Sequence, residues 1–121
     1  KTSRDFIFVE DLARGLIRCA LAGKPGEAYN LASGVETTIA ELASVINDAT
    51  RNPTPPEYLP ARDWDRSGKR FGSTVKSKNE IGFEAKVSVS EGIDRLVEWT
   101  IANRDLITNC IARHDSQMQR L

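Results

Sequence analysis

The sequence has little of several residue types that mark particular classes of protein. Among 121 residues it has one histidine, one methionine and two cysteines. It contains no apolar run near the roughly 20 residues that cross a bilayer, and no charged-then-apolar leader opens it. Neither charge is in excess, since 17 Lys and Arg balance 17 Asp and Glu. These absences predict a cytoplasmic protein with no membrane partner, no metal site and no nucleic-acid partner, in which any basic site is local.

The two cysteines, Cys19 and Cys110, lack the spacing of metal ligands. Each lies in an apolar helical pattern, which favours a small buried thiol over a disulfide. The chain begins with Lys1 and enters a charged and then apolar stretch at once, so we expect it to be a piece of a longer protein.

The remaining composition is typical of a folded domain, with 40% hydrophobic and 28% charged residues. The patterning predicts an α/β fold that is mostly helical with a few short strands. Short β-prone runs predict strands at residues 6–9, 28–32 and 57–59. Helical spacing predicts helices at about residues 10–22, 39–50 and 73–81, and a long helix after residue 88 that loses regularity near residue 109.

Two helix starts have the form of a capping box, in which a hydroxyl and a carboxylate each satisfy a backbone N–H of the first turn. They are Thr38 with Glu41, and Ser88 with Glu91. Ser73 is the expected cap of the short helix between them. The first helix is expected to bury one apolar face, formed by Leu12, Leu16, Ile17, Ala20 and Leu21.

Two basic segments could carry chemistry. Arg4, beside the first strand, could offer a fork of donors to a phosphate or form a surface ion pair with Asp5. The segment 62–66, Arg-Asp-Trp-Asp-Arg, followed closely by Lys69 and Arg70, is either a solvated loop or a grip for a phosphate, a ring face and a ribose diol. Its two aspartates argue against single-stranded nucleic acid, because they would repel a phosphate backbone.

Two further places are weaker. The Ser33-Gly34 turn could present backbone N–H groups to an anion, although it lacks the glycines of a dinucleotide or P-loop fingerprint. His114 has no nucleophile near it in the sequence and is expected to face solvent. The residues therefore indicate no catalytic constellation, no cofactor loop and no metal cluster.

The order of the motifs carries a resemblance to a known family. The chain contains R-D-F-I-F-V-E-D at 4–11, Y-N-L-A-S-G at 29–34 and T-T-I-A-E-L-A at 37–43. The same series continues with R-x-x-D at 62–65, K-x-x-x-E-I-G-F at 76–83 and E-G-I-D-R-L-V-E-W at 91–99. Over roughly residues 1–107 this order resembles the C-terminal, substrate-binding half of extended short-chain dehydrogenase/reductases, the NAD-dependent nucleotide-sugar epimerases and dehydratases such as UDP-glucose 4-epimerase.

The resemblance implies a function and a set of site residues. It implies that residues 1–121 are the nucleotide-sugar-binding part of an NAD-dependent epimerase, an isomerase whose NAD-binding Rossmann domain and catalytic residues lie outside this chain. Arg4 and Arg62 would contact the diphosphate, and Asp65 would accept a hydrogen bond from the ribose. Phe6 and Ile39 would lie near the nucleoside. NAD would belong to the parent protein, and the fragment alone would be inactive.

Alternatives remain at this point. The parent could be a nucleotide-sugar 4,6-dehydratase or decarboxylase, or a non-catalytic nucleotide sensor of the same fold. In the family, the segment 28–32 is expected beside the sheet of the cofactor domain, so the isolated chain would expose a strand edge and the apolar faces of nearby helices. We therefore expect the fragment to self-associate.

Overall fold

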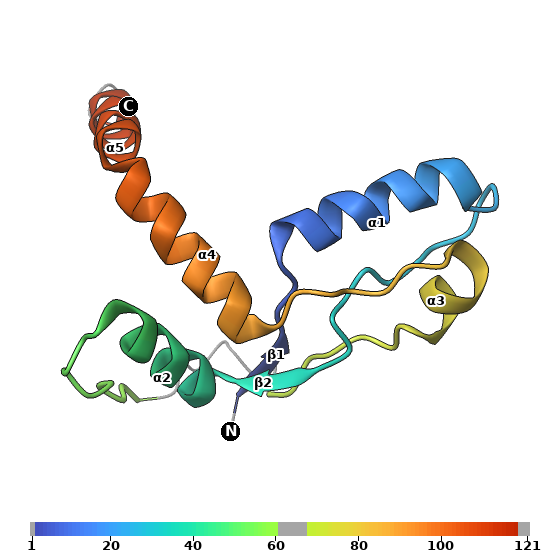
Figure 1. The fold of residues 1–121 in the computed structure, drawn as a ribbon, viewed down its shortest axis with the longest axis horizontal. Coiled ribbons are helices and arrows are strands. Elements are labelled where there is room, and N and C mark those ends of the chain that lie inside the picture. The colour runs from blue at the N-terminus through green and yellow to red at the C-terminus, as the bar shows by residue number, and fades with distance from the viewer. Residues whose placement is uncertain (1, 61–67, 119–121) are drawn as a thin grey trace.

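The computed structural model describes residues 2–60 and 68–118. Within them, helices surround a small two-stranded antiparallel sheet that lies near the middle of the molecule (Figure 1). The elements in chain order are β1 (Ser3–Asp5), α1 (Val9–Ala22), β2 (Glu36–Thr38), α2 (Ile39–Thr50), α3 (Val75–Ile81), α4 (Val89–Ala102) and α5 (Arg104–Met118). This mostly helical chain with short strands confirms the predicted fold class.

The two-stranded sheet brings together two segments that are more than thirty residues apart in the sequence. Ser3 lies opposite Thr38, Arg4 opposite Thr37 and Asp5 opposite Glu36. On the other side of β1, a single parallel bridge joins Ser3 to Lys69. The short strand β1 is therefore flanked on both sides, and its side chains have fixed directions.

The structure corrects the predicted strands. The apolar run at 6–9 is not a strand, because the ladder ends at Asp5 and no described strand lies beside residues 6–8. Val9 already begins α1. The segments 28–32 and 57–59 also lack a described strand partner and form no strand. β-Propensity alone does not make a strand where no neighbour supplies backbone hydrogen bonds.

The capping predictions are confirmed in part. Thr38 and Glu41 form the complete capping box of α2. Ser88 accepts the Glu91 N–H at the start of α4, whereas the Glu91 carboxylate accepts from Arg95 at 2.6 Å. The cap of α3 is Thr74 and not Ser73.

The C-terminal region is also more regular than its sequence pattern indicates. α5 continues as a helix to Met118, where loss of regularity near residue 109 was expected. Both cysteines are free, but Cys19 is only half-buried and Cys110 is exposed, so the prediction of buried thiols is wrong. No helix in the described ranges is long and apolar enough to span a membrane.

The buried part of the chain lies where α1, α3 and the segment after α3 meet. Ile81 and Phe83 are its buried hydrophobic side chains in the part of the chain that the structure describes. Asp11 of α1 is fully buried beside them and accepts hydrogen bonds from the backbone N–H groups of Lys86 at 2.9 Å and Val87 at 2.8 Å. A guanidinium of Arg14 also donates to Asp11. This carboxylate fastens the start of α1 to residues about 75 positions later.

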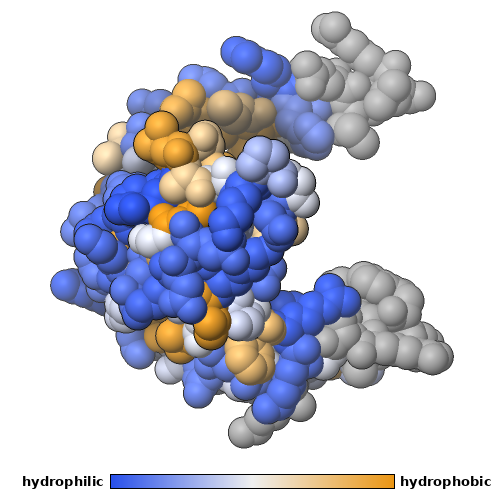
Figure 2. Space-filling view, turned by 90° about the vertical axis from the view of Figure 1, so that its right-hand side faces the viewer, coloured by the Kyte–Doolittle hydropathy of each residue, from blue (hydrophilic) through white to orange (hydrophobic). Residues whose placement is uncertain are grey.

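Most of the apolar surface of the chain is uncovered. The predicted core face of α1 is exposed, with Leu16 and Ile17 each 59% accessible and Leu21 83% accessible. The residues that α1 does bury are Asp11 and Gly15. Figure 2 shows apolar patches at the surface among hydrophilic side chains.

The total accessible surface expresses the same fact. It is 9639 Å², whereas a compact monomer of 13.4 kDa exposes about 6,500 Å². An open apolar groove of about 680 Å³ also runs between α2 and α4. By itself the chain therefore buries much less surface than an independent domain of its size.

Candidate functional site

Arg4 lies at the centre of β1, where it pairs with Thr37 of β2. Its guanidinium donates to the backbone oxygen of Ser3 at 2.7 Å and to that of Gly68 at 2.9 Å. Two backbone bonds reinforce this contact, from Ser3 N–H to Gly68 at 3.2 Å and from Arg70 N–H to Ser3 at 3.2 Å. The segment that begins at Gly68 is thus tied directly to the strand that carries Arg4.

The register assigns side chains to the two faces of this small sheet. Paired residues share a face and successive residues alternate. Ser3 and Lys69 therefore share one face with Glu36, and their side chains meet there. The Ser3 hydroxyl donates to a Glu36 carboxylate oxygen at 2.6 Å, and the Lys69 ammonium lies 3.2 Å from the same oxygen. The hydrogen bond from Ser3, and then that from Lys69, hold the pKa of Glu36 below its ordinary value.

The opposite face of the sheet is basic. Arg4 and its partner Thr37 lie on it. Arg70 lies on it as well, because Ser3 pairs with Lys69 and the next residues on both strands point the other way. The basic face is defined here as Arg4, Thr37 and Arg70.

The Ser33-Gly34 turn is filled by an anion that belongs to the protein. One Asp5 oxygen accepts the N–H and the hydroxyl of Ser33, at 2.7 and 2.6 Å, and the other accepts the N–H of Gly34 at 2.9 Å. The sequence analysis considered this turn as a possible anion site, and in the structure its N–H groups are taken by the Asp5 carboxylate. The turn therefore acts as a structural clasp between β1 and the segment before β2.

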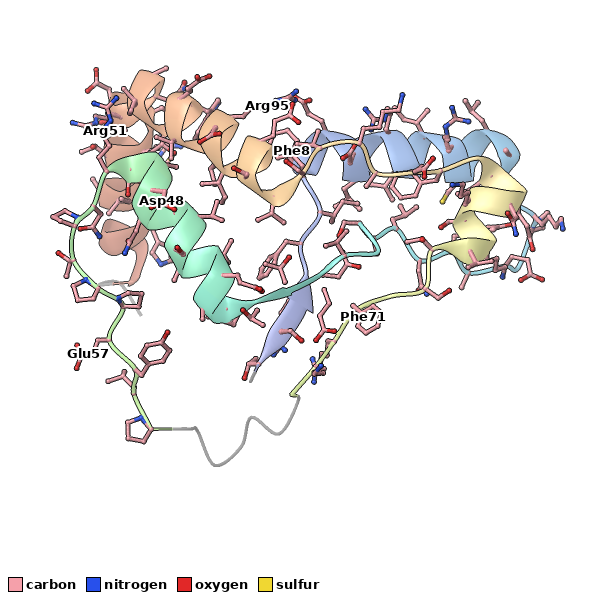
Figure 3. The ribbon with its side chains drawn as sticks, turned by 60° about the horizontal axis from the view of Figure 1, so that its bottom comes forward. Phe8, Asp48, Arg51, Glu57, Phe71 and Arg95 are labelled. Carbon is pink, nitrogen blue, oxygen red and sulfur yellow. The ribbon has the colours of Figure 1, made fainter. Side chains whose placement is uncertain are left out.

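A cavity of about 560 Å³ opens beside the two-stranded sheet. It is lined by Arg4, Asp5, Lys69, Arg70, Phe71 and Gly72. Phe71 is 59% exposed and is labelled in Figure 3, on the chain that runs next to β1. The cavity combines guanidinium donors with one exposed aromatic ring, which is suited to an anionic ligand that has a flat or apolar part.

The structure brings three of the five predicted site residues to the same region. Phe6 follows Arg4 by two residues and is half-buried at a smaller apolar cavity of about 290 Å³. Ile39 follows Thr37 by two residues, is 46% exposed and donates its N–H to Thr2 at 3.1 Å. Arg4 thus lies within the two-stranded sheet, and Phe6 and Ile39 lie just beyond the ends of its strands.

The other two predicted residues, Arg62 and Asp65, lie outside the described residues. Gly68, the first described residue after them, is the one bonded to Ser3 and Arg4. The sequence noted Lys69 and Arg70 only as basic neighbours of segment 62–66. Their places on opposite faces of a strand were not foreseeable without the bridge to Ser3.

The remaining chemical candidates are not part of this region. His114 is exposed, as expected. No group of His, Cys, Asp and Glu side chains within residues 2–60 and 68–118 is arranged to hold a metal ion.

Comparison with known proteins gives the family context. No family model matches the chain. The UDP-glucose 4-epimerase of Mycolicibacterium smegmatis is 32% identical over 97 residues, which is 80% of this chain and 31% of the epimerase. The dTDP-glucose 4,6-dehydratase of Actinoplanes sp. is 33% identical over 104 residues, covering 84% and 32%. UDP-glucuronic acid decarboxylase 2 of Arabidopsis thaliana is 34% identical over 98 residues, covering 81% and 22%.

A comparison with solved structures points to the same group of enzymes. The enzyme WbmF of Bordetella bronchiseptica, in complex with NAD⁺ and UDP, superposes with a TM-score of 0.83 at 52% identity. The match covers 99% of this chain and 36% of WbmF. The chain therefore has the fold of about a third of an extended short-chain dehydrogenase/reductase. Its homology, over about a third or less of the length of the curated relatives it matches, is to NAD-dependent epimerases and dehydratases that act on nucleotide sugars.

Proposed function

We propose that this chain is the nucleotide-sugar-binding part of an NAD-dependent epimerase. In the parent protein, NAD would supply the hydride acceptor and donor for reversible oxidation at C4 of the sugar, and an acid/base residue outside this chain would exchange the proton of the C4 hydroxyl. A Rossmann domain outside residues 1–121 would hold NAD and supply the catalytic residues. On this proposal the chain binds and orients the substrate, and it is inactive alone.

One observation carries the proposal, namely the attachment of Gly68 to the strand of Arg4. Arg62 and Asp65 precede Gly68 by only a few residues in the sequence. The bonds from Ser3 and Arg4 to the Gly68 backbone fix the end of their segment beside β1. This supports a site in which the guanidiniums of Arg4 and Arg62 reach one diphosphate.

The chemistry of such a site follows from the residue types. Two planar guanidiniums can each make paired hydrogen bonds to phosphate oxygens. A carboxylate such as Asp65 accepts hydrogen bonds from a ribose diol, and Phe6 and Ile39 would offer apolar surface to the nucleoside. A diphosphate held in this way would place the sugar at a fixed position against the nicotinamide, which reduces the entropy lost in reaching the transition state.

The uncovered apolar surface supports the second part of the proposal. The exposed stripe of α1 and the extended segment 28–32 without a described strand partner are the features of a chain that packs against further structure. An NAD-binding domain with a sheet and helices would cover both.

A specific observation favours the runner-up reactions as well. Relatives of similar identity include a 4,6-dehydratase and a decarboxylase. These reactions begin with the same oxidation at C4 and differ in later acid and base steps. A non-catalytic nucleotide sensor would retain binding but lack the Tyr-x-x-x-Lys pair in the parent sequence.

The test uses the complete gene product that carries these residues. Calorimetric titration with UDP-, dTDP- and GDP-sugars should give saturable binding to one series. Arg4→Gln should weaken that binding at least about tenfold, because a charged hydrogen bond to phosphate is lost. Arg51→Gln is the matched control, since Arg51 lies at the far end of α2, away from Phe71 in Figure 3.

Product analysis with NAD then separates the reactions. A C4 epimer supports the main proposal, whereas a 4-keto-6-deoxy sugar or loss of carbon dioxide supports a runner-up. Binding without turnover supports the sensor. Absence of binding to all three nucleotide series would overturn the proposal.

A further inference from the structure

Arg70 lies beside Arg4 near β1. The Arg70 guanidinium, unlike that of Arg4, makes no hydrogen bond or ion pair with the described residues. The parallel bridge between Ser3 and Lys69 makes Arg4 and Arg70 neighbours on adjacent strands and on the same face. Both line the cavity of about 560 Å³. Two arginines from segments 66 residues apart in the sequence thus line one opening.

The described carboxylates near Arg70 are engaged in other contacts. Glu36 takes the Lys69 ammonium and the Ser3 hydroxyl on the opposite face. Asp5, the acidic residue in the described lining of the cavity, has both oxygens occupied by the Ser33-Gly34 turn. Among the described residues, the Arg70 guanidinium has no hydrogen-bond or ion-pair partner.

This contrast between neighbours is informative. Lys69 and Arg70 are adjacent basic residues that both line the cavity, yet Lys69 is paired with Glu36 and Arg70 has no such partner among the described residues. Like charges on adjacent strands repel, so an anion between Arg4 and Arg70 would be stabilised by both. An arginine is also suited to a planar or tetrahedral oxyanion, because its fork of donors fits two oxygens at once.

We propose that Arg70 binds an anionic group of the nucleotide sugar together with Arg4 and thereby helps to select the substrate. The proposal rests on the proposed function, since the ligand is the one assigned to this face above. Two anionic groups share the required chemistry. One is the diphosphate, and the other is a carboxylate on the sugar, as in a uronic acid.

The test compares three ligands that differ in one charged group at a time. UDP, UDP-glucose and UDP-glucuronate, or the matching series of the nucleotide that the wild type binds, are titrated calorimetrically into the complete gene product at fixed ionic strength. The variants are Arg70→Gln and Arg70→Lys, with Arg51→Gln as the control. Arg70 is exposed, so the variants should keep the circular dichroism spectrum of the wild type.

The outcomes identify the group. A loss of about tenfold or more for all three ligands in Arg70→Gln assigns the diphosphate. A loss confined to the uronate assigns the sugar carboxylate. In either case Arg70→Lys should recover part of the affinity, because it restores the charge without the fork.

Failure of this inference is distinguishable from failure of the proposed function. If Arg70→Gln binds every ligand within twofold of the wild type while Arg4→Gln is weakened, Arg70 has no role and the nucleotide-sugar site stands. If the wild type binds no ligand of any of the three nucleotide series, both proposals are overturned.

Discussion

Replacing Asp11 by alanine should destabilise the fold more than any exposed substitution in α1. The Asp11 carboxylate is fully buried and accepts two backbone N–H groups, from Lys86 and Val87, besides the Arg14 guanidinium. Hydrogen bonds to a charged group contribute about 1.5–3 kcal/mol each. Loss of the two backbone bonds, which leaves two donors without an acceptor, should therefore cost about 3–6 kcal/mol.

Asparagine at this position separates charge from shape. Asp11→Asn keeps the size and one oxygen acceptor, and one carboxylate oxygen accepts both N–H groups in the native protein. The amide therefore loses the negative charge and the bond from Arg14 rather than the two backbone bonds, so we expect about half the loss. The control is Glu10→Gln, at the position just before Asp11 in the same helical turn, where the Glu10 side chain is 64% exposed. Its ion pair with Arg95 is a surface pair, and its removal should change stability by at most about 1 kcal/mol.

The measurement is urea unfolding of the protein, followed by circular dichroism and analysed at constant m-value. Such a loss is a large fraction of the 5–15 kcal/mol that typically separates folded and unfolded states. If Asp11→Ala and Glu10→Gln had equal unfolding midpoints, the carboxylate would not fasten α1 to residues 86–87, and the account of the buried region would be wrong.

Three further predictions concern the helix cap, the pKa of Glu36 and the uncovered surface. Thr38→Ala removes the hydroxyl that accepts the Glu41 N–H and should lower the free energy of unfolding by about 1 kcal/mol, measured by urea unfolding; an unchanged midpoint would refute the capping role. The pKa of Glu36 is lowered in the folded state, so its contribution to stability is present above the ordinary pKa of a glutamate and is lost as pH falls through the folded value. NMR titration should find its midpoint below that of an unfolded glutamate, and Ser3→Ala should move it upward; equal midpoints would contradict the bond from Ser3. Residues 1–121 expressed alone should self-associate, and a monomer by light scattering at high concentration would count against that expectation.

The sequence was sufficient where local chemistry decides the structure. Thr38 and Glu41 lie three residues apart, and the capping box that they form needs nothing from the rest of the chain. The helices α1, α2 and α4 follow from apolar spacing in the same way. Arg4 was expected beside a strand at 6–9, whereas it lies at the centre of β1, which precedes the apolar run.

Long-range contacts account for what could not be predicted. The apolar run 6–9 has strand propensity, but a strand needs a neighbouring strand to bond with, and the pairing of β1 with β2 ends at Asp5. Leu16 and Ile17 have the spacing of a core face, yet nothing in the described chain covers them. The partition of Lys69 and Arg70 depends on one bridge to Ser3, 66 residues earlier, which no local pattern records.

The large accessible surface has a thermodynamic consequence. It exceeds that of a compact monomer of this mass by about 3,000 Å², which is in the range that obligate interfaces bury. Ordering the backbone and covering its apolar stripes are then a single cooperative event, because neither half of that event is favourable without the other. If the chain packs against further structure as proposed, its midpoint of unfolding should rise with the concentration or the covalent attachment of that structure.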